Sequence, residues 1–249
     1  MTLAHDVAGA GPAVLLLHST VADRRMWDPQ VPALTAAGYR VVRCDLRGFG
    51  ETPMPDGLYN DADDVAELLD VLGADRVAVV GASGGGRVAL EFAARWPARV
   101  TALALLATAL RGHPRGPELQ EFGEREDALL EAGDVDGATE LNVDRWLGPA
   151  AGDEARAAVR TMQRHTFDVQ LAVPEEPEQI RYAYDLAAVT ARTLLVSGAH
   201  DVPDFREIAE RLATELPHAS LRQLDWAGHL PSLERPDLLN PILVEFLAA

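Results

Sequence analysis

One serine stands among glycines in the stretch VVGASGGGRVALEF, which runs from Val79 to Phe92. Gly81, Ser83 and Gly85 satisfy the pattern Gly-x-Ser-x-Gly, between an apolar run typical of a buried strand and a helical pattern. A serine in so tight a turn is strained, and glycines on both sides remove side chains that would collide where strand and helix converge. The hydroxyl is then exposed beside the N–H groups of the helix N-terminus. The spacing predicts that Ser83 is a nucleophile.

A serine hydroxyl needs a base to take its proton and an acid to orient that base. His229 lies in LDWAGHLPSLERP, after the last expected strand and before the last expected helix, and is favoured as the base. Asp201 follows the apolar run in TLLVSGAHD and is favoured as the acid. Its rival Asp204 is better placed to cap the next helix, with Glu207 three residues further on as in a capping box. The predicted catalytic residues therefore run in the order Ser, Asp, His.

These residues need a scaffold, and the pattern of the chain supplies one. Short β-type runs alternate with helical patterns, which predicts an α/β fold with a mainly parallel, doubly wound sheet. The alternation stops over residues 111–188, which are rich in charge, proline and glycine and show only helical fragments. We expect an inserted helical cap there, with residues 1–110 and 189–249 forming the core. The expected strands are Ala13–Leu17, Tyr39–Cys44, Arg76–Val80, Val100–Leu106, Thr193–Ser197 and Ser220–Leu224.

Composition excludes several other classes of protein. The formal charge of −17 argues against a nucleic-acid partner, whose phosphates would be repelled. The N-terminus lacks a basic leader and Ala13–Leu17 is too short to span a bilayer, so we expect a cytoplasmic protein with no membrane partner. The single Cys44 excludes an intramolecular disulfide. No spacing of metal ligands and no dinucleotide signature is present, so we expect no metal and no cofactor. Neither a monomer nor a homodimer is favoured.

Five segments together resemble the α/β-hydrolase superfamily, in the group with a small helical cap. In the family's order they are VLLLHS…MWDPQVPAL, DLRGFGET, GASGG, SGAHD and GHLPSLERP, from about Ala13 to the C-terminus. The resemblance implies an oxyanion hole made by the N–H groups of Gly84 and Thr20. Relatives usually carry His-Gly where this chain has His18-Ser19, so Ser19 or its hydroxyl is an alternative donor. His18 is expected to brace the loop.

The resemblance also implies a reaction class. Haloalkane dehalogenases and epoxide hydrolases are expected to carry aspartate at the position of Ser83, so the serine disfavours both. It favours acyl transfer from a small-molecule carboxylic ester or lactone, as in 3-oxoadipate enol-lactonases and small carboxylesterases. Carbon–carbon bond hydrolases of ring-cleavage products and cofactor-free haloperoxidases share the triad and stay open as alternatives. A ligand-binding receptor that retains the triad also stays open.

The substrate contacts are less defined by the sequence. Ser19, Trp27, Trp146 and Met162 are candidate contacts, with ordinary packing as the alternative for Trp27, Trp146 and Met162. The missing side chain of Gly84, where relatives often have a larger residue, is expected to leave room beside the nucleophile.

Charged residues near the expected site are expected either to hold its structure or to set the charge that the substrate meets. Asp45 and Arg47 in DLRGFGET are expected to be structural partners in a turn behind the site. The acidic composition disfavours a strongly anionic substrate, unless a cap arginine such as Arg145 or Arg164 reverses the local charge.

Overall fold

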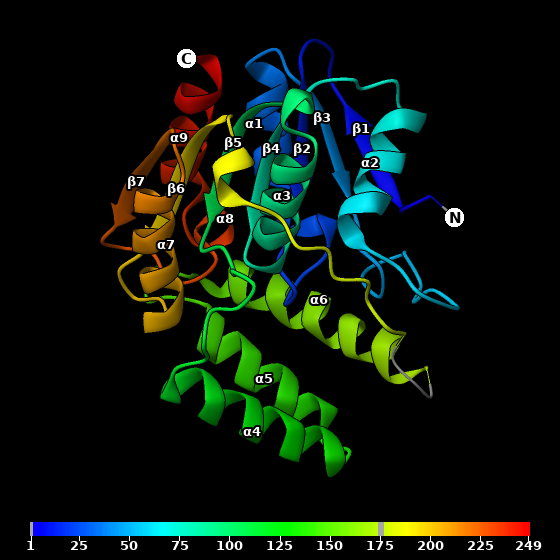
Figure 1. Cartoon of the computed structure of the whole chain (residues 1–249). Helices are drawn as coiled ribbons and strands as arrows, with labels where there is room; N and C mark the ends of the chain where they lie inside the picture. Colours follow the sequence, from blue (N-terminus) through cyan, green and yellow to red (C-terminus); the bar gives the residue numbers. More distant parts are fainter. Residues whose placement is uncertain (1, 174–176) are drawn as a thin grey trace.

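The computed structural model describes residues 2–173 and 177–249, and its centre is a seven-stranded sheet (Figure 1). The strand order is β1-β3-β2-β4-β5-β6-β7. β1 pairs antiparallel with β3, and every other neighbouring pair is parallel. The strands are β1 (His5–Ala8), β2 (Ala13–Leu17), β3 (Arg40–Cys44), β4 (Val77–Ala82), β5 (Val100–Leu106), β6 (Arg192–Gly198) and β7 (Ala219–Leu224). The predicted α/β fold with a mainly parallel sheet is confirmed.

The central strands are continuous apolar runs because both faces of the sheet are covered. β2 reads AVLLL and β5 reads VTALALL, and nearly all of these side chains are buried. The sequence does not predict β1, which reads HDVA and is a partly exposed edge strand. Its short polar pattern carries no local signal, and its place is set by pairing with β3, where Val7 lies opposite Val42.

Helices cover both faces of the sheet in a doubly wound arrangement. In Figure 1, α2, α3 and α7 lie on one face, and α1 and α9 pack against each other on the other face. The helices of the core are α1 (Gln30–Ala36), α2 (Asp61–Val71), α3 (Gly84–Arg95), α7 (Pro203–Glu215), α8 (Pro231–Glu234) and α9 (Pro236–Ala248). Short 3₁₀ turns join these elements, among them η1 (Arg24–Trp27), η2 (Pro97–Arg99) and η3 (Leu186–Ala188).

The start of α7 differs from the prediction. The helix begins at Pro203 with Val202 at the capping position, and no side chain caps it there. Asp204 lies inside the first turn, and its carboxylate accepts a hydrogen bond from the Gly116 amide at 2.6 Å. The predicted capping box of Asp204 and Glu207 is therefore wrong, because a long-range contact takes the carboxylate.

The helices of the segment predicted as a cap, residues 111–188, lie beyond one end of the sheet in Figure 1. Its helices within the described residues are α4 (Pro117–Glu131), α5 (Val135–Trp146) and α6 (Asp153–Leu171). α4 packs against α5, and α5 packs against α6. On the way back to the core, Gln179 forms an isolated bridge with Tyr59. In the part of the chain that the structure describes, no helix is long and apolar enough to cross a bilayer.

The parallel strands bring four predicted site residues to one edge of the sheet. Thr20 follows β2, Ser83 follows β4, Asp201 follows β6 and His229 follows β7. In open α/β sheets the crevice outside the carboxyl ends of the strands is the usual place for a ligand. The topology thus gathers at this edge residues that lie far apart in the sequence.

Candidate active site

Ser83 occupies the turn between β4 and α3 in a left-handed backbone conformation, with φ 50° and ψ −115°. Such a conformation costs a non-glycine residue about 1–3 kcal/mol, so the surroundings must enforce it. The end of β5 does so through backbone hydrogen bonds. The Ser83 amide donates to Leu106 O at 2.9 Å, and the Ala109 amide donates to Ser83 O at 3.0 Å.

The glycines around Ser83 are required by close backbone approaches. A Cβ atom on Gly81 would lie 2.6 Å from Gly85 O, and one on Gly85 would lie 2.3 Å from His18 O. A Cβ atom on Gly86 would lie 2.5 Å from Thr108 Oγ1. These three positions let α3 start directly against β4 and the loop after β2. The turn is therefore tightly packed.

His229 and Asp201 form a buried pair. His229 Nδ1 donates a hydrogen bond to Asp201 Oδ2 at 2.8 Å, and the two side chains are only 2% and 1% exposed. The other carboxylate oxygen of Asp201 accepts the Val202 amide at 2.7 Å. Because an ionised carboxylate only accepts hydrogen bonds, the proton of neutral His229 sits on Nδ1 and Nε2 is free to act as a base.

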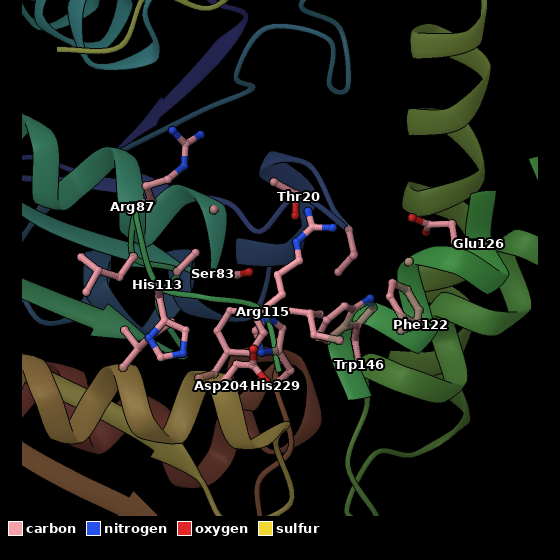
Figure 2. A pocket seen from close by; sticks show the side chains of 18 residues that line it. Thr20, Ser83, Arg87, His113, Arg115, Phe122, Glu126, Trp146, Asp204 and His229 are labelled. Carbon is pink, nitrogen blue, oxygen red and sulfur yellow. The ribbon is translucent and has the colours of Figure 1, made fainter. Parts of the chain in front are cut away.

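Ser83 and His229 line one cavity of about 380 Å³, together with Thr20 and Gly84 (Figure 2). Among the described residues, no hydrogen bond joins Ser83 Oγ to the His229 ring. Catalytic hydrogen bonds of this kind are often long in free enzymes and tighten when substrate binds. The structure thus brings the three predicted triad residues to the same site, with the acid–base contact already formed.

Two aromatic rings enclose His229. The ring centroid of Trp146 lies 4.6 Å from that of His229, and the centroid of Phe205 lies 4.2 Å from it. Trp146 Nε1 donates to Asn142 Oδ1 at 2.8 Å, and the Asn142 amide donates to Glu126 Oε1. The two rings thus cover the imidazole, which is only 2% exposed. Of the two, only Trp146 could be proposed from the sequence, since a phenylalanine just after the acid loop carries no motif.

Glu234 holds the loop that carries His229. Its buried carboxylate accepts the Gly228 amide at 2.8 Å and the Leu230 amide at 3.1 Å. Burial raises the pKa of this carboxyl, while the amides of Gly228, Gly148 and Leu230 act to lower it. The segment GHLPSLERP contains Glu234, but the sequence assigns it no role because its contacts are all to backbone.

The opposite wall of the site is the loop after β2, and His18 braces it as expected. Its Nδ1 donates to Ser19 O at 2.8 Å, and its Nε2 accepts the Leu46 amide at 2.9 Å. Burial lowers the pKa of His18, so the ring stays neutral in this role. The Ser19 amide donates to Met26 Sδ at 3.2 Å, and Ser19 is buried outside the cavity lining. Ser19 is therefore committed to the loop.

Thr20 and Gly84 lie next to each other beside Ser83. A Cβ atom on Gly84 would lie 2.4 Å from Thr20 Cγ2. The expected room beside the nucleophile is therefore absent, because the methyl group of Thr20 occupies it. As the first residue of α3, Gly84 has an N–H group without an intrahelical acceptor. That this N–H and the Thr20 N–H form an oxyanion hole stays a prediction.

Two other predicted substrate contacts lie elsewhere. Trp27, in η1, and Met162, in α6, are almost fully buried and do not line the cavity. They pack in the core, so the substrate-binding expectation for both is wrong. A tryptophan or methionine gives the same apolar signal in either role.

The turn DLRGFGET is structural, with separate partners for Asp45 and Arg47. Asp45 accepts hydrogen bonds from the amide and guanidinium of Arg24, and Arg47 pairs with Asp64 at 2.7 Å. Neither Asp45 nor its partner Arg24 lines the cavity. The expected structural role therefore holds, although the two residues do not pair with one another among the described contacts.

The charged lining of the cavity differs from the expected one. Arg145 pairs with Glu118 at 2.8 Å and Arg164 pairs with Asp136, both on the cap and outside the cavity. The charged or titratable residues that line the cavity besides His229 are Arg87, His113, Arg115, Glu126 and Asp204. Within the described ranges no group of three or more His, Cys, Asp or Glu side chains is placed to hold a metal ion.

The fold and this site agree with known proteins. The sequence model of the alpha/beta hydrolase family matches residues 14–242, and the chain belongs to this family. A Variovorax paradoxus protein with the provisional name carbamate hydrolase RutD is 32% identical, over 100% of this chain and 97% of that protein. A thermophilic esterase from Thermogutta terrifontis is 29% identical with a TM-score of 0.78, covering 99% of this chain and 93% of its own. The enol-lactonase from Burkholderia xenovorans LB400 is 25% identical with a TM-score of 0.80, covering 99% and 96%.

Proposed function

We propose that this hydrolase cleaves a carboxylic ester or lactone of a small molecule through an acyl-enzyme on Ser83. One observation carries the proposal: Ser83 sits in a strained turn on the same cavity as His229, whose Nδ1 is hydrogen-bonded to Asp201 at 2.8 Å. The arrangement supplies a nucleophile, a base with a free Nε2 and an acid that orients the base.

In the first step, Ser83 Oγ attacks the carbonyl carbon while His229 Nε2 takes the hydroxyl proton. Asp201 stabilises the imidazolium that forms. The tetrahedral intermediate collapses as the carbon–oxygen bond of the leaving group breaks, and the imidazolium returns its proton to the leaving alkoxide. For a lactone the leaving alkoxide remains attached to the acyl group.

In the second step, water attacks the acyl-enzyme with His229 as the base, and the carboxylic acid leaves as Ser83 is restored. The N–H groups of Gly84 and Thr20 are proposed to donate to the oxyanion in both steps, and losing one such donor typically costs about 2.7–4 kcal/mol. We also propose that the helical cap, residues 111–188, sets the substrate range, since Trp146 and Glu126 reach the cavity from it.

Similar proteins support acyl transfer without fixing the substrate. The relatives above carry names of a carbamate hydrolase, an esterase and an enol-lactonase. All three names describe attack on a carbonyl carbon bearing a leaving group. Two of the names, the esterase and the enol-lactonase, refer to an ester or a lactone. We therefore prefer an ester or lactone as the substrate class.

The test uses an active-site probe and a substrate panel. A fluorophosphonate probe should label the wild-type protein and should not label Ser83→Ala. A panel of p-nitrophenyl esters, small lactones, a carbamate ester and a dienoic diketone should show turnover of an ester or lactone that falls about 10⁴-fold or more in the variant. Ser220→Ala, at an exposed serine on β7, is the matched control and should keep both labelling and turnover.

Other outcomes would point to the other functions. Cleavage of the diketone alone would make the protein a carbon–carbon bond hydrolase. Peroxide-dependent halogenation without ester turnover would indicate a perhydrolase. Labelling of Ser83 with no turnover of any substrate would favour a ligand-binding protein that retains the triad.

A further inference from the structure

Arg115 is placed over the candidate active site by the segment that leads from β5 into the cap. It lines the same cavity as Ser83 and His229, and Figure 2 shows its side chain reaching across the cavity towards the Thr20 loop. Within the described residues, no carboxylate lies at ion-pair distance from its guanidinium. The other arginine of the lining, Arg87, already pairs with Asp61 at 3.4 Å.

The backbone that carries Arg115 is held in place on both sides. The Gly116 amide donates to Asp204 Oδ1 at 2.6 Å, and Gln120 Nε2 donates to Arg115 O at 2.6 Å. The guanidinium rests against α4, where a Cβ atom on Gly123 would lie 3.7 Å from Arg115 Nη1. Because this backbone is already ordered, binding through Arg115 need restrict only the rotamers of its side chain.

The acidic residues of the cavity have other partners. Glu126 accepts a hydrogen bond from Asn142, and Asp204 accepts the Gly116 amide. Burial raises the pKa of Glu126, whereas the nearby charge of Arg115 acts to lower it. Arg115 therefore keeps its N–H donors available, and its positive charge is only partly offset.

Most of the cap arginines that the structure describes form an ion pair with a carboxylate. The formal net charge is −17, with 39 acidic residues to 22 basic ones. The cap arginines that form ion pairs with carboxylates are Arg111, Arg145, Arg156, Arg160 and Arg164. Within the described residues, Arg115, Arg125 and Arg181 form no such pair, and of these three only Arg115 lines the cavity with Ser83.

From this placement we propose that the preferred ester or lactone carries a free carboxylate, bound by Arg115 while its carbonyl group meets Ser83. The planar guanidinium matches a carboxylate with two parallel hydrogen bonds, and Arg87 adds positive charge from the side of α3. The proposal rests on the proposed ester or lactone hydrolysis and adds the chemical class of the substrate.

The test compares two esters of similar size, p-nitrophenyl butyrate and mono-p-nitrophenyl succinate, which differ by a terminal carboxylate. The wild-type protein should have the higher kcat/KM for the succinate ester. Arg115→Gln should lower the ratio of the two kcat/KM values about 10-fold, because a charged hydrogen bond to the carboxylate is lost. The preference should also weaken as the salt concentration rises, since Arg115 is exposed.

Matched variants separate the explanations. Arg145→Gln removes an arginine of the same cap that is paired with Glu118 outside the cavity, and it should leave the ratio as in the wild type. Arg115→Lys keeps the charge but not the planar fork and should fall between wild type and Arg115→Gln. An equal kcat/KM for both esters in the wild type, or a ratio that Arg115→Gln does not change, would overturn the proposal.

A binding experiment distinguishes failure of this proposal from failure of the proposed function. In the Ser83→Ala background, calorimetry should show tighter binding of the succinate ester than of the butyrate ester, with the difference lost on adding Arg115→Gln. If the wild type cleaves the neutral ester but this difference is absent, only the carboxylate proposal is wrong. If neither ester is cleaved but the succinate ester still binds more tightly, the carboxylate site stands. The proposed ester hydrolysis is then wrong.

Discussion

Glu234 accepts hydrogen bonds from the amides on both sides of His229, from Gly228 at 2.8 Å and from Leu230 at 3.1 Å. A single buried carboxylate thus fixes the backbone that aims the imidazole at the cavity. Because it touches neither Ser83 nor the space for the reacting carbonyl, Glu234 is a positioning residue.

Glu234→Ala should lower kcat by roughly 100-fold, since small misplacements of a catalytic base are costly. KM should change little, because Glu234 does not line the cavity. Glu234→Gln keeps one acceptor oxygen and should recover part of kcat. Steady-state kinetics at matched folded fractions measures this split, with Asp237→Asn, at an exposed neighbour, as the control. A rise in KM at constant kcat would show that Glu234 acts on substrate binding instead.

Asp201→Asn should lower kcat about 10⁴-fold, as loss of the orienting acid does in serine proteases. Ester turnover measured with saturating substrate checks this, and circular dichroism checks the fold. The control is Asp225→Asn, at an exposed aspartate just after β7. Near-normal activity in Asp201→Asn would return the role of the acid to Asp204.

Trp146→Ala should lower kcat/KM about 10-fold or more, because it opens the aromatic wall that lies 4.6 Å from the His229 ring. Trp146→Phe keeps an aromatic face but loses the hydrogen bond to Asn142, and should lose less. Stopped-flow measurement of acylation compares the two variants. Equal rates for both would mean that the aromatic face contributes nothing to the reaction.

Gly84→Ala should lower stability by about 1–3 kcal/mol and reduce activity, because the new Cβ atom would meet Thr20 Cγ2 at 2.4 Å. Thr20→Ala removes that methyl group and keeps the Thr20 amide. The double variant should therefore recover most of the loss, with a coupling of about 1 kcal/mol or more in a double-mutant cycle. Additive effects in urea unfolding would show that the two side chains do not compete for this space.

The stability of the wild type relative to Glu126→Gln should fall as the pH rises. Burial raises the pKa of Glu126 above its ordinary value of 4.5, so near that pH the folded chain binds more protons than the unfolded one. The contribution of Glu126 to the free energy of unfolding is fully present below pH 4.5. It is lost as the pH rises through the higher pKa that Glu126 has in the folded state. Urea unfolding of both proteins at a series of pH values measures the difference. A wild-type advantage that grows with pH would contradict the assignment.

Much of the site could be predicted because its signals are local. Ser83, Asp201 and His229 each follow an apolar run that forms a strand, and parallel strands carry such residues to one edge. The role of Glu234 could not be predicted, since its partners are backbone amides that any residue would offer.

Contacts between distant segments account for the other differences. Asp204 has the pattern of a helix cap, but the Gly116 amide, 88 residues away, takes its carboxylate. Arg115 has the same residue type as the paired cap arginines, and only the three-dimensional fold places it on the cavity that Ser83 lines. Sequence patterns describe neighbours along the chain, whereas these roles depend on neighbours in space.

The close approach of Gly148 to Gly228 limits how this enzyme can be re-engineered. A Cβ atom on Gly148 would lie 2.4 Å from Gly228 N and 2.6 Å from Glu234 Oε2. The chain just after α5 is thus seated directly on the loop that carries His229. A cap transplanted from a relative would need glycine at this junction, or the graft would displace the base as it changed the specificity.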